Sequence, residues 1–108
     1  MLTRRAFLGG GLALAGTTLL PARGSRAAVA DLDFASALDA ARAIRTGQVS
    51  SVELTARMLD RIAQHNPKLN AIVTLTADAA LARAKAAAEA RAHGEWWGPF
   101  HGVPCTVK

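Results

Sequence analysis

The sequence of 108 residues predicts an α/β fold, in which helices alternate with short strands. Three segments have the pattern of helices, at residues 36–46, 50–66 and 77–93. Two runs rich in β-branched residues, at 69–75 and 103–108, favour strands. Local signals set where each of these elements begins and ends.

The first predicted helix begins at Ser36, whose hydroxyl can cap the orphan backbone N–H groups of a helix start. Asp39 follows three residues later, where a carboxylate complements the positive helix end. Gly47 is expected to end the helix, because glycine readily adopts the left-handed conformation of a C-cap. The apolar positions at helical spacing predict one buried stripe: Leu38, Ala41 and Ile44.

The second predicted helix opens with a capping box, in which Ser50 caps and Glu53 reaches back. Pro67 is expected to stop it near Asn66, because proline disfavours a helical residue before it. Its apolar face is set by residues that repeat every four positions: Leu54, Met58 and Ile62. Its polar face, interpreted as solvated charge, carries Glu53, Arg57 and Asp60.

The third predicted helix follows the strand at 69–75, with Thr76 as its cap and Asp78 in its first turn. Residues 77–93 contain ten alanines, and alanine has the highest helix propensity. Gly94 is expected to end this helix. Its small side chains predict close packing against a neighbouring helix.

Charge is divided unevenly along the chain. The first 30 residues contain four arginines and no acidic residue, whereas residues 31–108 contain nine basic and eight acidic residues. The net charge of +5 therefore belongs almost entirely to the N-terminal segment. A nucleic-acid-binding domain concentrates Lys and Arg on one face. Residues 31–108 are nearly neutral, so nucleic-acid binding is excluded.

The segment Thr3–Leu8, with Arg4 and Arg5 paired, resembles the twin-arginine export motif. The apolar stretch that follows is shorter than the ~20 residues of a stable membrane-spanning helix. Small residues at Ala28 and Ala30 suit signal-peptidase cleavage after Ala30. Residues 1–30 are therefore expected to be a signal peptide read by the twin-arginine machinery, and the protein to be periplasmic or secreted. Cleavage after Ala28, an uncleaved anchor and an ordinary amphipathic helix remain alternatives.

The last eleven residues combine turn-forming residues with apolar alternation. Glycines at 98 and 102 and prolines at 99 and 104 surround a short apolar run that ends on Lys108. Since side chains alternate along a strand, one face is expected to be apolar and buried, and Lys108 to point to the other. The residues of that apolar face are Val103, Cys105 and Val107.

This stretch resembles the glycine-proline-leucine-x-glycine-valine-proline-x-x-valine-lysine motif of the amidase signature family, with Phe100 and Cys105 as departures. The resemblance implies a mixed sheet surrounded by helices, of which residues 31–108 would be the incomplete N-terminal part. It also implies hydrolysis of a carboxylic amide by a serine–cis-serine–lysine triad, without a cofactor. The triad's lysine falls on Lys108, and the motif with both serines lies downstream in the family. The chain alone is thus expected to be inactive.

A lysine has an ordinary pKa near ~10.4, so a lysine that acts as a base must be held neutral. Burial can lower a lysine pKa by up to ~3–5 units. In the resembled triad the neutral lysine accepts a proton from the nucleophilic serine through the bridging serine. The catalytic residue predicted in this chain is therefore Lys108.

Other residues near this stretch have side chains capable of chemistry. Cys105 with His101 could form a nucleophilic pair, but the apolar strand face predicts an inert buried thiol. Histidines 65, 93 and 101 lack the spacing of metal ligands, so no metal site is expected. Trp96 and Trp97 could line a substrate entrance, although a hydrophobic anchor for the loop is the stronger interpretation.

Two alternatives to an exported amidase stay open. The amidase-type subunit of a transfer-RNA amidotransferase resembles the same stretch, although a cytoplasmic role conflicts with an export signal. A small exported helical module that binds a partner is the non-enzymatic alternative, and it predicts cooperative folding of residues 31–108. A core of that size without a disulfide rarely supplies more than ~3–5 kcal/mol, which favours part of a larger domain.

Overall fold

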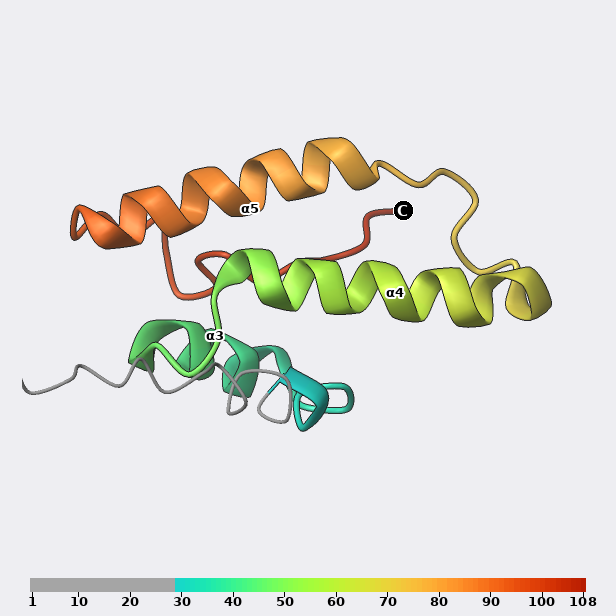
Figure 1. The fold of residues 1–108 in the computed structure, drawn as a ribbon, viewed down its shortest axis with the longest axis horizontal. Helices are drawn as coiled ribbons and strands as arrows, with labels where there is room; N and C mark the ends of the chain where they lie inside the picture. Colours follow the sequence, from blue (N-terminus) through green and yellow to red (C-terminus); the bar gives the residue numbers. More distant parts are fainter. Residues whose placement is uncertain (1–28) are drawn as a thin grey trace, which may run out of the picture.

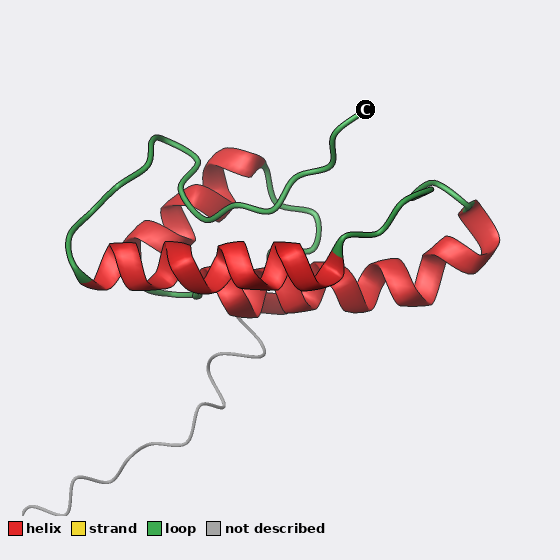
Figure 2. Ribbon diagram, turned by 90° about the horizontal axis from the view of Figure 1, so that it is seen from above, coloured by secondary structure: helices red, strands yellow, loops and turns green. Residues whose placement is uncertain are grey.

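The computed structural model describes residues 29–108, and the predicted signal segment lies almost wholly outside this range. Three helices follow one another: α3 (Ala37–Thr46), α4 (Ser51–Leu69) and α5 (Ala77–Ala92) (Figure 1). Residues 29–30 are also helical, and the rest of residues 29–108 is loop and turn, without a strand (Figure 2). The described part is thus helical, with its three helices close to their predicted ranges.

Both predicted strands are wrong for this structure. Leu69 is the last residue of α4 and residues 70–75 form a loop, while residues 103–108 follow an irregular path. A strand depends on hydrogen bonds to the backbone of a neighbouring strand. Residues 29–108 provide no such neighbour, so β-branched composition alone does not produce a strand here.

Helix α3 has the predicted caps. The Ser36 hydroxyl accepts a hydrogen bond from the Asp39 N–H at 3.1 Å, and Gly47 closes the helix at φ 79°. The predicted buried stripe is wrong at Leu38, which is half exposed. At 100° per residue, the centre of the buried face lies about 140° round the helix from Leu38. That face consists of Ala40, Ala41, Ala43 and Ile44.

Helix α4 begins with the predicted capping box. The Glu53 N–H donates to the Ser50 hydroxyl at 3.1 Å, and the Ser50 N–H donates to Glu53 Oε2 at 2.9 Å. The predicted end near Asn66 is wrong, because the helix continues through Pro67 to Leu69. Proline in this last turn removes only one helical hydrogen bond. The Asn66 side-chain amide bonds both the N–H and the C=O of Ile72 and ties the following loop to this last turn.

Helix α5 runs antiparallel to α4, and the two pack side by side (Figure 1). Its buried residues, at spacings of three, are Ala84, Ala87 and Ala90. These methyl groups allow the close approach predicted from the composition. Thr76 precedes the helix without a side-chain capping bond, and Gly94 follows it at φ 77°.

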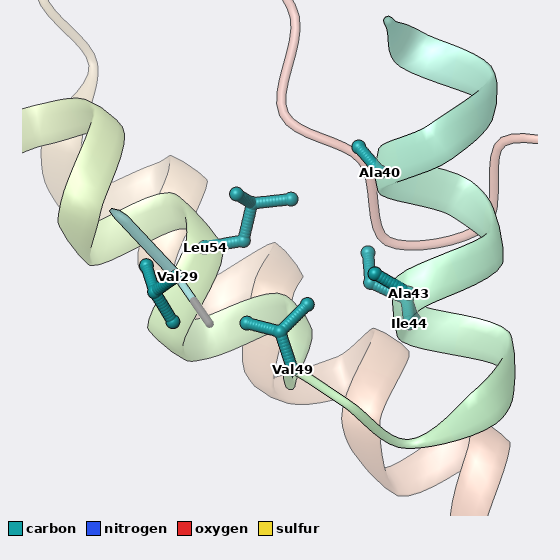
Figure 3. Close-up of a cluster of buried hydrophobic side chains, with 6 residues drawn as sticks. All are labelled: Val29, Ala40, Ala43, Ile44, Val49 and Leu54. Carbon is teal, nitrogen blue, oxygen red and sulfur yellow. The ribbon is translucent and has the colours of Figure 1, made fainter. Parts of the chain in front are cut away.

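The apolar core lies where the start of the described chain, α3 and the first turn of α4 meet (Figure 3). Val103 of the C-terminal segment packs against its edge. The core therefore fixes one point of that segment to the helices. Its buried members are Val29, Ala40, Ala43, Ile44, Val49 and Leu54.

An ion pair joins the turn before α3 to α4. Arg57 donates from Nε and Nη2 to the Asp33 carboxylate at 2.9 and 2.6 Å, and Arg61 donates to the Asp33 carbonyl oxygen. The expectation that Arg57 is only solvated charge is therefore wrong. The hydrogen bonds from Arg57 hold the pKa of Asp33 below its ordinary value of 3.8.

This lowered pKa predicts a pH dependence. Since the folded state favours the Asp33 carboxylate, the ion pair contributes fully above pH 3.8 and is lost as pH falls through the lowered pKa of Asp33 in the folded protein. We expect Asp33→Asn to lower the urea midpoint of unfolding more at about pH 6 than at about pH 2.5. The exposed Asp31→Asn is the control, and an equal effect of Asp33→Asn at both pH values would contradict the prediction.

Candidate functional site

The C-terminal segment runs back along one side of the α4–α5 pair (Figure 2) and borders an open groove of 570 Å³. Helix α4 contributes Ser51 and Thr55 to its wall, and α5 contributes small side chains and Arg83. The remaining wall is the loop from Trp97 to Cys105. The groove thus lies against the glycine- and proline-rich motif singled out from the sequence.

His101 is the buried polar residue of this loop, with 5% of its surface exposed. Its Nδ1 accepts a hydrogen bond from the Trp97 N–H at 3.1 Å, and its Nε2 lies 2.8 Å from the Ala87 carbonyl oxygen. A carbonyl oxygen only accepts, so Nε2 is the donor. The imidazole therefore links the loop backbone to α5.

Two tryptophans flank this imidazole. The rings of Trp96 and Trp97 lie 5.1 and 4.9 Å from the His101 ring, centroid to centroid. Arg45 of α3 lies over Trp96 at 5.5 Å and Arg83 of α5 over Trp97 at 4.1 Å, at cation–π distance. This arrangement supports the loop-anchor interpretation, while Trp97 also lines the groove.

A second link joins the loop to α4. The hydroxyl of Ser51, 2% exposed, donates to the Gly102 carbonyl oxygen at 2.6 Å. Gly102 has φ 75°, and a Cβ there would lie 2.9 Å from the Ser51 Cβ. Only glycine fits this approach without strain. The loop is thus held to α5 through His101 and to α4 through Gly102.

The chain beyond this loop carries the predicted catalytic residue. Lys108 is exposed and does not line the groove. The predicted apolar strand face is wrong, because Cys105 and Val107 are exposed and only Val103 is half-buried. Cys105 is therefore not the buried thiol that the alternation predicted, and both His101 ring nitrogens are bonded elsewhere.

The other histidines lie outside this site. His65 is exposed on α4, and His93 is the exposed C-cap of α5. Among residues 29–108, no three His, Cys, Asp or Glu side chains gather closely enough to hold a metal ion. None of the helices in that range is long and apolar enough to cross a bilayer.

Sequence reasoning missed the roles of Ser51 and His101. The capping-box pattern assigns Ser51 no contact of its own, and proximity to Cys105 suggests for His101 only a weak nucleophilic pair. A hydroxyl at the first helical position, on the same side as Leu54 and Thr55, was an available signal for burial. Nothing local indicates that His101 bonds a helix fourteen residues earlier.

The loop with its buried histidine leads to Lys108 and is held to both α4 and α5. The family model described as Amidase matches residues 53–108, from the first turn of α4 to Lys108. The chain belongs to the amidase family. No solved structure matches the chain.

Curated relatives include enzymes of two kinds. The chain is 48% identical over 73 residues to an indoleacetamide hydrolase of Bradyrhizobium diazoefficiens, an alignment covering 68% of this chain and 14% of the relative. It is 49% identical over 74 residues to the A subunit of a glutamyl-tRNA(Gln) amidotransferase from Azoarcus sp., covering 68% and 15%. The corresponding protein of Thioalkalivibrio sulfidiphilus is 52% identical over 66 residues, covering 61% and 13%. The chain therefore spans about one seventh of the length of these relatives.

Proposed function

We propose that this chain is the N-terminal portion of an exported amidase that hydrolyses the C–N bond of a carboxylic amide. Lys108 is the base of a serine–cis-serine–lysine relay whose serines come from the segment that follows it. The observation that carries the proposal is the family match over residues 53–108, which includes the motif lysine at its end. The relative named indoleacetamide hydrolase supports hydrolysis of an amide.

In the proposed chemistry, the relay removes a proton from the nucleophilic serine and later delivers it to the leaving amine. In the proposed relay, Lys108 takes the proton of the bridging serine, which takes that of the nucleophilic serine. The serine oxygen attacks the amide carbonyl carbon, and backbone N–H groups stabilise the oxyanion. The C–N bond then breaks, the amine leaves with the relayed proton, and water hydrolyses the acyl-enzyme. This scheme requires no cofactor.

An assay of the full-length protein tests this function. We define this protein as the present chain together with the segment encoded after Lys108. Purified protein should release ammonia from primary carboxylic amides, and added hydroxylamine should intercept the acyl-enzyme as a hydroxamate. Ester substrates run in parallel measure the preference between C–N and C–O cleavage. Absence of ammonia release across aliphatic and aromatic amides would reject the hydrolase.

A second candidate is the amidase-type subunit of a transfer-RNA amidotransferase. It is supported by the relatives with that name in Azoarcus and Thioalkalivibrio, at 49% and 52% identity. This candidate predicts that the released ammonia is transferred to a glutamyl group on transfer RNA, with partner subunits present. Amide hydrolysis by the purified single chain, at a rate that transfer RNA does not alter, favours the amidase.

Export is tested separately from activity. Fusion of residues 1–30 to a reporter should direct it across the membrane in a manner that Arg4→Lys with Arg5→Lys abolishes. The mature mass then gives the cleavage position. Val29 packs in the core beside Val49 and Leu54, so cleavage after Ala30 would remove a core residue and cleavage after Ala28 would keep it.

A further inference from the structure

We propose that His101 is a positioning residue: its neutral imidazole, protonated at Nε2, joins the Trp97 backbone to the Ala87 carbonyl and sets the path of the chain toward Lys108. The inference deepens the proposed function, and its kinetic consequence rests on that function. Its structural content, a defined tautomer with two defined partners, is testable without any activity.

The geometry requires this protonation state. The Trp97 N–H points at Nδ1 at 3.1 Å, so Nδ1 must carry a lone pair. The Ala87 carbonyl oxygen lies 2.8 Å from Nε2, so Nε2 must carry the proton. One neutral tautomer satisfies both partners. An imidazolium or the opposite tautomer would place an N–H against the Trp97 N–H.

Because His101 is buried, loss of either of its hydrogen bonds would destabilise the folded protein. His101 is 5% exposed and is flanked by the two tryptophan rings. A buried N–H or C=O without a partner loses its bond to water without gaining another. The charged groups that the structure places on this cluster are the guanidinium groups of Arg45 and Arg83, each over one tryptophan ring.

The bonds of His101 lie in the part of the loop that determines the direction of the chain toward Lys108. The Gly102 carbonyl is held by Ser51, and Val103 packs against the core. His101 adds the link to α5, so three successive residues fix the loop to α5, α4 and the core. Beyond them, residues 105–108 are exposed. The direction in which Lys108 leaves the helices is therefore set at residues 101–103.

Two substitutions each keep one of the two hydrogen bonds of His101 and remove the other. His101→Gln places an amide N–H within reach of Ala87 but offers nothing to the Trp97 N–H. His101→Asn offers an oxygen to the Trp97 N–H but is too short for Ala87. In the full-length protein we expect both to lower kcat by roughly 10- to 100-fold, because small misplacement of a catalytic group costs this much. KM should change less than about twofold, since the substrate's own contacts are retained.

The matched control is Ile44→Val, which removes one methyl group from the core at a residue that takes part in neither hydrogen bond of His101. It should lower the unfolding temperature and leave kcat unchanged. If the His101 variants lower stability as this control does but keep the wild-type kcat, the positioning role is overturned. Loss of kcat in the His101 variants alone, with folded protein verified by circular dichroism, supports it.

Imidazole nitrogen NMR of the wild-type protein gives a readout that does not depend on activity. With the His101 signal assigned by its loss in His101→Gln, we expect the neutral Nε2–H form. The Nδ1–H form or an imidazolium at neutral pH would overturn the inference. If Lys108→Met retains activity while His101 shows the expected tautomer, the proposed function fails and the structural linkage stands. If Lys108→Met abolishes activity while His101 shows another protonation form, the linkage is rejected and the proposed function stands.

Discussion

Lys108→Met in the full-length protein is expected to lower kcat for amide hydrolysis by roughly 10²–10⁴-fold. Methionine has a similar length but no nitrogen lone pair, so it cannot take the relayed proton. At 1.36 kcal/mol per factor of ten, this loss corresponds to about 3–5 kcal/mol of transition-state stabilisation. Initial rates of ammonia release over a range of amide concentrations measure it, and KM should change much less than kcat.

Two companion variants separate the base from a simple charge. Lys108→Arg keeps a positive charge, but a guanidinium stays protonated and cannot accept a proton, so it should be as inactive as Lys108→Met. Lys85→Met removes an exposed lysine from α5 and should retain full activity. Wild-type rates in Lys108→Met, or a fully active Lys108→Arg, would remove Lys108 from the relay.

The helices could be predicted because their signals are local. The Ser50–Glu53 capping box and the closing Gly47 act within a few residues, and the structure shows both. The predicted end of α4 near Asn66 was wrong because it used only the local preference of Pro67, whereas the helix continues to Leu69. The bonds from the Asn66 side chain to Ile72 beyond the helix cannot be inferred from the proline either.

The strands and the loop contacts depend on partners distant in sequence. A β-branched run at 69–75 becomes a strand only beside another strand, and residues 29–108 contain none. The bond from Ser51 to Gly102 joins residues 51 positions apart. The motif at 98–108 is a local pattern, so the sequence alone could indicate the amidase family. The burial of His101 and the exposure of Cys105 depend on distant contacts and required the three-dimensional structure.

Gly102→Ala is expected to be the most destabilising single change in the loop, by about 2–4 kcal/mol. Two costs combine at this position. A φ of 75° places a Cβ against its own backbone, which costs roughly 1–2 kcal/mol. The added Cβ also lies 2.9 Å from the Cβ and 3.0 Å from the Oγ of Ser51. Ser51 cannot retreat cheaply, because it is buried and its hydroxyl bonds the Gly102 carbonyl.

Gly94→Ala separates these two costs. Gly94 has nearly the same φ, 77°, but a Cβ there would meet no atom within 4 Å. It should therefore lose only the backbone contribution of about 1–2 kcal/mol. Urea titration of the full-length protein compares the two, and equal midpoints would show that the contact with Ser51 costs nothing. Because the clash pushes the loop away from α4, Gly102→Ala should also lower kcat, whereas Gly94→Ala should leave it unchanged.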